Sequence, residues 1–464
     1  MNSNIKKFDS KEAFDAYRAT DGWAYPSVNY ITNNEESSIH YNNEFIMEWN
    51  ENDTIKAPAF YGDVSHDEFK AWVDKCAKPC EIKKDGTDFA YIKRVSDSSS
   101  EVDDWTLRHG TNAGSSHYSD TDNGTSDYFQ MVELQNINVG LFKDTKKGTK
   151  QIRFNFDKGC PDGFHKWFPN STDGTKLFGR YDIAPTVSTS TAGTNGIEVC
   201  FGSSQGTYLN TTSGLTNGYS KGNWNSEKLL EGINHVNAGL DSSVSGKYQF
   251  MEETYWEHLV MSYIFCAYFK TFDTQSVYRG LDLGYTDGNA GQWSAGTVDN
   301  SVKTHLGSTH GTPGSNTSPY KFLHIENALH GKQWIWGAGW WGNNGKYYMT
   351  FDDKKANLAC NLAIANADIT GTYATNWSQT YITDIDLYGV PEDTTGATGE
   401  STQYTGSSSR GFFDACWSNT GASQVAYLGG GSDLGARVGA FARAFSNDAS
   451  SAYWSRRGRI TMNK

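Results

Sequence analysis

An aromatic block between Lys321 and Phe351 sets the strongest constraint on how this chain can fold. Besides two Phe, the block contains four Trp and two Tyr: Trp334, Trp336, Trp340, Trp341, Tyr347 and Tyr348. Each aromatic ring buries about 150–250 Å² when it packs in a protein interior, so this block is too apolar to lie in water. We therefore expect most of the block to sit in a core.

The spacing of residues in this block and near the end of the sequence is typical of strands. Trp334 and Trp336 alternate with smaller or aliphatic residues, and the four glycines at 337, 339, 342 and 345 predict turns that divide the block into short pieces. Residues 425–428 and 459–462 are expected to form two further strands. Between these two strands, residues 429–457 read as a Gly-rich surface loop.

Composition favours a turn-rich β or α+β protein. Gly makes up 48 of 464 residues, Pro only 9, and aromatic residues 14%, a mixture unlike that of a helical bundle or a disordered chain. The 40 Lys and Arg against 53 Asp and Glu give a net charge of −13. This balance argues against nucleic acid as a partner, because phosphate binding needs a basic face. We expect a β-rich α+β fold.

The cysteines and acidic stretches do not predict a metal site. The seven Cys are an odd number, and the sequence opens MNSNIKKFDS without an apolar signal segment, which indicates synthesis in a reducing cytoplasm. Cys76 and Cys80 are spaced like half a metal site, but no second close pair completes it. The stretch 120–127 resembles a calcium loop without its closing Glu. We predict no metal, no cofactor and no membrane insertion, because no apolar run is long enough to span a bilayer.

Three regions are expected along the chain. Residues 1–60 contain one helix, at 11–17, and one hairpin, at 28–41, and have too few apolar residues for a core of their own. We predict that they form an N-terminal attachment or oligomerisation arm. Residues 61–125 are expected to be a small β-rich segment followed by a linker loop, and residues 126–464 to be the main domain.

Several elements are predicted within these regions. Residues 66–76 have apolar side chains at i, i+3 and i+4 and are expected to form a short amphipathic helix. The turn Asp85-Gly86 predicts a hairpin, residues 96–126 a surface loop, and residues 128–157 a set of strands with period-2 alternation.

Residues 248–270 form the clearest predicted helix, and its apolar residues surround most of the helix axis, which is typical of a buried helix. We expect Trp334 and Trp336 to share one core with this helix. Its three glutamates and one histidine, Glu252, Glu253, Glu257 and His258, lack the spacing of a zinc protease and are interpreted as solvated or capping residues.

The order of three segments resembles a known domain. IENALHGKQWIWG, GFFDACWSNTGASQVAYLGGG and GAFARAFSNDASSAYWSRRGRITM resemble, as an ordered set, the C-type-lectin-like domain that tailed bacteriophages carry on fibres and receptor-binding proteins. More distantly they resemble the formylglycine-generating-enzyme fold. Two upstream segments, KPCEIKKDGT and EHLVMSYIFCAYFKTFDTQSVYRG, also fit the phage version. The resemblance implies that the helix at 248–270 packs against the sheet.

The resemblance favours binding over catalysis. Oxidase activity in the enzyme relatives rests on a pair of Cys after the glycine-rich turn, and GGGSDLGARVGAFARAF contains none. Cys416 is interpreted as a small core residue. No nucleophile elbow, phosphate loop or dinucleotide fingerprint is present. In the lectin-like relatives the corresponding stretch contacts ligand, and its Arg, aromatic and Asn residues here are typical of binding hot spots. The predicted ligand-binding residues are Arg437, Arg443, Asn447, Asp448, Tyr453, Trp454, Arg456 and Arg457.

These observations lead to a functional hypothesis. We expect a phage virion structural protein, a head or tail fibre subunit made in the host cytoplasm, that binds a host-surface glycan or protein and is not an enzyme. Fibre proteins are usually trimers, so a homotrimer is expected, with the arm at 1–60 contacting other virion proteins. Two alternatives remain open: a capsid-decorating protein without a receptor, and a carbohydrate-active enzyme.

Overall fold

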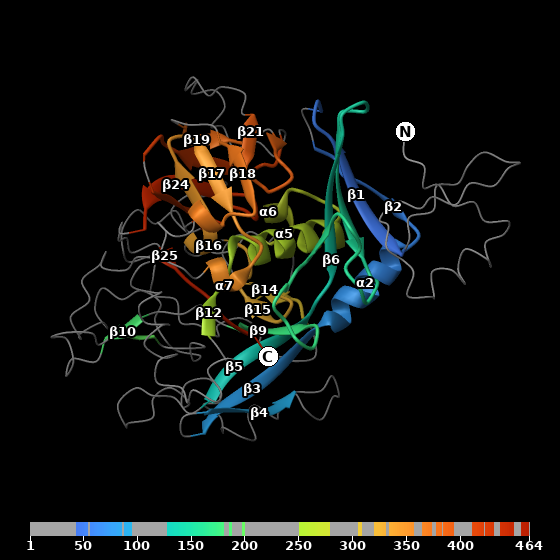
Figure 1. Ribbon diagram of the computed structural model, residues 1–464. Coiled ribbons are helices and arrows are strands. Elements are labelled where there is room, and N and C mark those ends of the chain that lie inside the picture. Colours follow the sequence, from blue (N-terminus) through green and yellow to red (C-terminus); the bar gives the residue numbers. More distant parts are fainter. Residues whose placement is uncertain are drawn as a thin grey trace, which may run out of the picture.

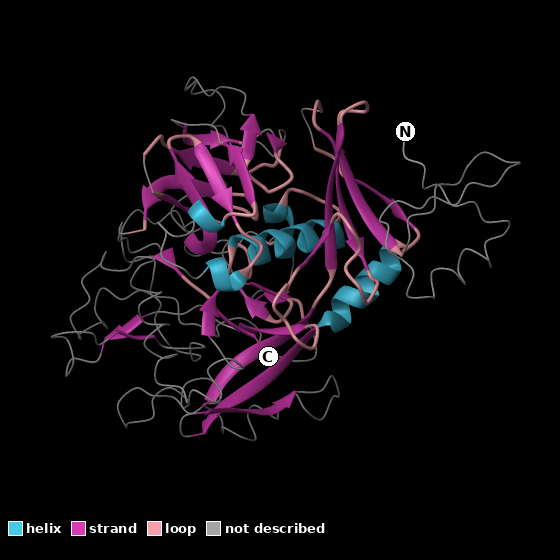
Figure 2. Cartoon of the chain, viewed as in Figure 1, coloured by secondary structure: helices cyan, strands magenta, loops and turns pink. Residues whose placement is uncertain are grey.

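Helix α5 (Tyr255–Phe269) lies at the centre of the protein, with β-sheets on several sides of it (Figure 1). The computed structural model describes residues 43–53, 56–85, 88–94, 128–180, 185–187, 197–199, 250–278, 305–308, 320–330, 334–356, 364–373, 377–382, 384–393, 411–421, 423–430, 437–449 and 456–463. Strands predominate among these residues (Figure 2). The fold is therefore β-rich α+β, as the composition predicts.

Helix α5 is defined at both ends and buried along its length. At its start the Thr254 side chain accepts from the Glu257 backbone N–H while the Glu257 carboxylate accepts from the Thr254 N–H, which is a capping box. At its end Lys270 adopts a left-handed conformation with φ 57°. All residues but the last are buried, so the expectation of a helix that is apolar all round is confirmed.

A five-stranded antiparallel sheet covers one side of α5. Its order is β2 (Ala59–Gly62), β1 (Glu44–Asn50), β7 (Thr149–Asn155), β6 (Asn138–Asp144) and β8 (Phe164–Lys166). Alternate residues of β1, which are Phe45, Met47 and Trp49, point into the core. Helix α2 (His66–Cys76) buries Phe69 and Val73 against the same core.

A six-stranded sheet joins distant parts of the sequence, and its strands β3, β4 and β5 lie below α5 in Figure 1. Its order is β12 (Phe250–Glu252), β26 (Ile460–Asn463), β9 (Thr175–Gly179), β5 (Tyr128–Gln135), β3 (Ala77–Asp85) and β4 (Asp88–Arg94). Strand β26 is inserted between β12 and β9. The last described strand is therefore part of the same sheet as the residues that immediately precede α5.

An eight-stranded sheet packs on α5 and contains the aromatic block. Seven of its strands follow the order β18 (Ile369–Thr372), β17 (Lys346–Met349), β16 (Trp334–Asn343), β23 (Gln424–Leu428), β24 (Arg443–Asp448), β22 (Ala415–Ser418) and β19 (Trp377–Tyr381). The eighth strand, β25 (Arg456–Arg457), pairs in parallel with the start of β16.

The remaining elements are short. Two strand pairs are β10 (Pro185–Val187) with β11 (Ile197–Val199) and β20 (Asp384–Ile385) with β21 (Pro391–Asp393). A three-stranded sheet consists of β13 (Gly307–Ser308), β14 (Tyr320–Phe322) and β15 (Ile325–Glu326). The short helices are α6 (Thr274–Val277), α7 (Asp353–Ala356) and η3 (Ile364–Asn366).

Some sequence expectations are confirmed and others are corrected. Helix α2 occupies the predicted residues, and β3 and β4 form the predicted hairpin. The central helix begins at Tyr255 and not at 248, because residues 250–252 are strand β12. The predicted boundary at residue 60 does not separate an arm from the main domain within the described residues. Strand β1, which precedes that boundary, pairs along its full length with β7 of the main domain. The segment 61–125 likewise contributes β3 to a sheet shared with β5.

Other expectations concern residues outside the described ranges. These are the helix at 11–17, the hairpin at 28–41, the loop at 96–126, and the calcium-like stretch at 120–127.

The aromatic block differs from its prediction in two ways. First, Gly337 and Gly339 do not end a strand, because β16 runs continuously from Trp334 to Asn343 with a register shift between residues 337 and 341. Gly339 has φ +86°, and a Cβ there would lie 2.7 Å from the Ala356 Cβ, so the bulge needs glycine. Second, Ile335 and Trp340 pack in the main core with α5, whereas Trp334 and Trp336 are outside that cluster.

Candidate functional site

The segment that was expected to be a ligand-binding loop is largely part of the eight-stranded sheet. Residues 438–445 are buried, and β24 lies between β23 and β22 with pairing on both sides. The surface-loop prediction for residues 429–457 is therefore wrong over this described part. Glycine frequency suggested a loop, whereas residues 440–445 alternate alanine with the larger Phe441, Arg443 and Phe445, and this part of the chain is buried and enters β24.

Arg443 is corrected from a surface residue to a core residue. Its side chain is not exposed to solvent, and its Nη1 donates to the carbonyl oxygens of Ala440 at 2.7 Å and Ala442 at 3.0 Å. The guanidinium also lies 5.5 Å from the centre of the Tyr255 ring, a cation–π distance. Arg443 thus connects the turn before β24 to helix α5 and cannot contact a ligand at the surface.

The other predicted site residues do not meet at one place on this sheet, because Asn447 and Asp448 are level with the end of β16, whereas Arg456 and Arg457 lie beside its start. Asn447 and Asp448, at the end of β24, are partly exposed, as is Arg437. Arg456 and Arg457 are placed by their backbone only, where Arg456 pairs with Trp334 and Arg457 with Ile335. Tyr453 and Trp454 lie outside the described residues.

Several large aromatic residues lie on the face of the eight-stranded sheet that points away from α5, and we call four of them the aromatic face: Trp334, Trp336, Trp417 and Tyr427. Trp336 lies opposite Tyr427, Tyr427 opposite Ala444, and Ala444 opposite Trp417. Directly opposed residues point to the same side of a sheet. Neighbouring residues such as Ile335 and Phe445 belong to the core with α5, so this row faces away from it.

The aromatic face has partly exposed rings at one end. Trp334 and Trp417 are both partly exposed, and their rings meet edge to face with centroids 5.2 Å apart. Trp336 is 4% exposed, and its Nε1 has no hydrogen-bond partner among the described residues. Because Asn447 lies opposite Val425, which lies opposite Trp341, it belongs to the next row on the same face. Indole rings with a nearby amide can stack on and hydrogen-bond to a sugar.

Sequence reasoning missed this arrangement. Trp334 and Trp417 are 83 positions apart in the sequence. They come into contact only through the pairing of β16 with β23, of β23 with β24, and of β24 with β22. The aromatic spacing of the block pointed to strands, but it gave no information on which face Trp334 would occupy.

The titratable residues near the start of α5 are buried, which corrects their interpretation as solvated. Glu253 accepts from Arg459 Nη1 at 2.9 Å and lies 3.2 Å from His258 Nδ1, and all three side chains are unexposed. Burial alone would raise the pKa of Glu253, but the charge of Arg459 and the hydrogen bond with His258 outweigh burial and hold it below its usual value.

A second buried cluster lies one turn further along the helix. Nζ of Lys176 donates at 2.5 Å both to Glu257 and to Asp353. Burial would lower the pKa of Lys176, yet the two carboxylates raise it, so the ammonium stays charged. The capping role predicted for Glu257 is confirmed, and the lysine gives it a second role. Neither cluster is open to solvent, so both hold elements together and neither offers a group to a substrate.

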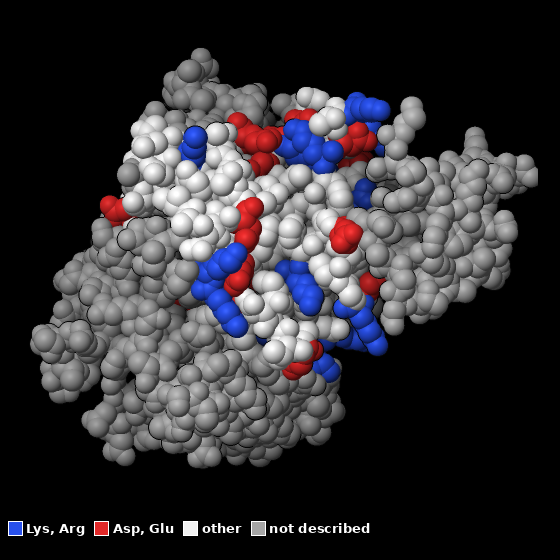
Figure 3. All heavy atoms as spheres, in the orientation of Figure 1, with Lys and Arg blue, Asp and Glu red and all other residues white. Residues whose placement is uncertain are grey.

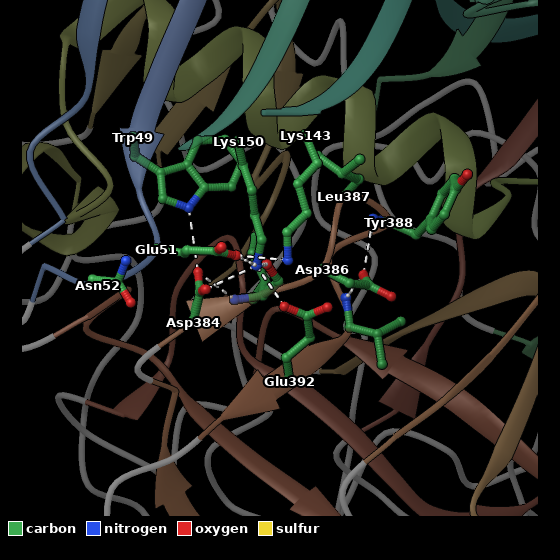
Figure 4. A network of polar contacts seen from close by, with 12 residues as sticks. Trp49, Glu51, Asn52, Lys143, Lys150, Asp384, Asp386, Leu387, Tyr388 and Glu392 are labelled. Atoms are coloured by element: carbon green, nitrogen blue, oxygen red, sulfur yellow. Dashed lines mark hydrogen bonds and ion pairs between the residues drawn. The ribbon is translucent and has the colours of Figure 1, made fainter. Parts of the chain in front are cut away.

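A third charged cluster connects the five-stranded sheet to the pair β20 and β21 (Figure 4). Carboxylate oxygens of Glu51, Asp384 and Glu392 lie within 4.8 Å of one another, as they would around a cation. The centre, however, is occupied by Lys150, whose Nζ is 2.8 Å from Asp384, 2.5 Å from Glu392 and 3.6 Å from Glu51. Burial would lower the pKa of Lys150, but Asp384 and Glu392 raise it. The lysine therefore supplies the positive charge, and the cluster reads as an ion-pair network.

Four of the five described cysteines have the character of core residues. Cys76, Cys80, Cys266 and Cys416 are buried and unbonded to one another, and Cys160 is exposed. Burial raises the pKa of the Cys416 thiol, which makes it a poor nucleophile. The prediction that Cys416 packs as a small core residue is confirmed.

Comparisons with known proteins add no relative: no protein-family model matches the chain, and no curated protein matches it significantly. Among the described residues, no helix is long and apolar enough to cross a membrane, and the longest, α5, has 15 residues.

Proposed function

We propose that this chain is a structural protein of a tailed-phage virion, a head or tail fibre subunit that binds a host-surface glycan or protein through a C-type-lectin-like domain. The proposal starts from the ordered segments that resemble such domains. The observation that carries it further is the aromatic face, because segments of the resemblance supply all four of its residues: Trp334 and Trp336 from the first, and Trp417 and Tyr427 from the second.

The construction of this face suits a binding site. Its strands are held by the core beneath them, where Trp340 stacks on Phe445 with ring centroids 4.1 Å apart. Partly exposed residues on a rigid support lose little conformational freedom when a ligand binds. Trp is also among the residues that contribute most to binding energy at protein surfaces. The partly exposed pair Trp334 and Trp417, with Asn447 nearby, is the part of the face that a ligand can reach.

A cell-binding assay tests this function. Labelled protein should bind host cells, and the double variant Trp334→Ala/Trp417→Ala should bind at least about tenfold more weakly, because hot-spot residues typically contribute 1 kcal/mol or more each. Phe142→Ala is the matched control, since Phe142 is a partly exposed aromatic residue on the five-stranded sheet. Equal loss in the control, or host binding that is unchanged in the double variant, would contradict the proposal.

Oligomeric state forms part of the same proposal. Fibre subunits are usually trimers, and we propose that this chain is a homotrimer in which residues 1–42, the part of the predicted arm that precedes the described residues, also contact other virion proteins. Light scattering on the purified protein should give about three protomers per particle, and a monomer would contradict this part.

A further inference from the structure

A polar cleft of about 730 Å³ opens on the side of the protein where α2 ends, away from the aromatic face. It lies between the end of α2, the ends of β5 and β7, the start of β6, and the turn at 171–175. Lysines, amides and two aromatic rings line it, among them Trp72, Lys75, Asn138, Phe156 and Lys158. A volume of this size accommodates a small-molecule ligand such as a short oligosaccharide.

Among the described residues, the lysines of this cleft form no ion pairs. Lys75, Lys78, Lys158 and Lys166 line it, and within the described part of the chain none of them has a carboxylate within 4.0 Å. Figure 3 shows blue Lys and Arg side chains in the lower centre of the visible face, where Figure 1 places the end of α2 and β9. The whole chain has a net charge of −13, so a group of four unpaired lysines here is a local exception.

The acidic residues of the cleft already have partners. Asp157 accepts hydrogen bonds from the amides of Asn43 and Asn155, each at 3.2 Å. Asp173 accepts from the Thr175 N–H at 3.0 Å and its hydroxyl at 2.7 Å, which closes the turn. Glu133, the third acid that lines the cleft, is buried. These hydrogen bonds come from neutral groups, so the cleft lining carries four lysines against three acids, and within the part of the chain that the structure describes the lysines are the residues without a hydrogen-bonded partner of opposite charge.

Buried amides give the cleft a fixed wall. Asn138 is 3% exposed, and its Nδ2 donates to the carbonyl oxygens of Asp157 at 3.0 Å and Gly159 at 2.7 Å. These bonds hold the backbone on which Lys158 sits. Beside this wall the partly exposed rings of Trp72 and Phe156 meet edge to face, with centroids 5.6 Å apart. Aromatic rings, amides and hydroxyls in one cleft match the apolar faces and hydroxyls of a sugar.

We propose that this cleft binds an acidic oligosaccharide, with sugar rings against Trp72 and the carboxylate, sulfate or phosphate groups of the sugar bound by the lysines. Unpaired ammonium groups would gain little from a neutral sugar, because charge-assisted hydrogen bonds need an anion. The binding site is separate from the aromatic face and does not depend on the function proposed for that face.

Calorimetric titration with defined sugars tests the proposal. The probes are short oligomers of a uronic acid, of a sulfated sugar and of a phosphorylated sugar, together with the neutral oligomer of equal length. At least one acidic probe should bind the full chain, and the neutral one should not. The variant Lys75→Glu/Lys158→Glu should weaken that binding about tenfold or more, and raising the salt concentration should weaken binding to the parent protein.

A second charge-reversal pair is the matched control. Lys346 and Lys354 are exposed and lie outside the cleft, so Lys346→Glu/Lys354→Glu changes net charge equally and should keep the parent affinity. Trp334→Ala/Trp417→Ala should also bind the sugar normally, which separates this site from the aromatic face. The proposal is wrong if no acidic probe binds, if the control pair loses affinity as much as the cleft pair, or if an oligonucleotide of equal charge competes as well as the sugar.

Discussion

Nη1 of Arg459 lies 2.9 Å from Oε2 of Glu253, and neither side chain is exposed to solvent. Arg459 immediately precedes β26, and Glu253 lies between β12 and α5. The same guanidinium donates to the carbonyl oxygens of Ala328 at 3.0 Å and Asn327 at 3.2 Å. One arginine therefore connects the last described strand, the start of the central helix and the turn after β15.

The first prediction concerns this ion pair. Arg459→Met should lower the free energy of unfolding by about 3–5 kcal/mol, because it leaves the Glu253 carboxylate buried without its cation. The double variant Glu253→Leu/Arg459→Met removes both charges and should be more stable than Arg459→Met alone. Urea unfolding of the three proteins measures both differences. A double variant no more stable than the single one would show that the carboxylate is not the source of the loss.

The second prediction separates the two faces of the eight-stranded sheet. Trp340 is buried and contacts Tyr255 and Phe445, so Trp340→Ala should cost about 3–5 kcal/mol of stability. Trp417 is partly exposed on the opposite face, so Trp417→Ala should cost only about 1 kcal/mol. Thermal unfolding of both variants gives the comparison, and similar losses would contradict the assignment of faces.

The third prediction concerns pH. Glu44 in β1 is 2% exposed, and burial raises its pKa from 4.5 to about 7, although Arg153 Nη1 lies 3.5 Å away and partly opposes the shift. Between these two pH values the unfolded chain has released the Glu44 proton and the folded chain retains it. The free energy of unfolding should therefore fall as pH rises from 4.5 to 7, by about 1 kcal/mol per pH unit from this group.

The variant Glu44→Gln isolates this contribution. Gln has nearly the same shape and does not titrate, so the variant should gain stability relative to the parent as pH rises through the same range. Stability curves of the two proteins that stay parallel from pH 4.5 to 7 would show that Glu44 has an ordinary pKa in the folded state.

Elements whose signal is local could be predicted from the sequence. In α2, the apolar spacing of Phe69, Trp72 and Val73 defines one helix face, and the structure buries Phe69 and Val73 and leaves Trp72 partly exposed. In β7, Ile152 and Phe154 alternate with polar residues and both lie in the core. Helix α5 was recognisable because its apolar residues surround the axis. Each of these patterns depends only on residues within one element.

Features that depend on distant partners could not be predicted. Glu257 looks like a surface acid until Lys176, 81 residues away, is brought beside it. Arg443 looks like a surface base until the carbonyl oxygen of Ala440 and the ring of Tyr255 surround it. The cleft lysines come from α2, β3, β8 and the residues after β7, and only the fold brings them together. A single sequence does not show which strands pair or which residues lie opposite each other, so these contacts are visible only in the structure.

The last prediction concerns the two arginines of β25. Arg456 pairs with Trp334 and Arg457 with Ile335, so the backbone of both lies beside the start of β16, next to Trp334 of the aromatic face. Arginine there can donate to acidic groups of a capsular polysaccharide or a surface protein while Trp334 and Trp417 contact its apolar parts. Arg456→Ala/Arg457→Ala should leave the melting temperature nearly unchanged and weaken attachment to host cells. The loss should be larger at low salt, where charges are least screened. If the double variant attached as well as the parent at both salt concentrations, these arginines would have no part in host binding.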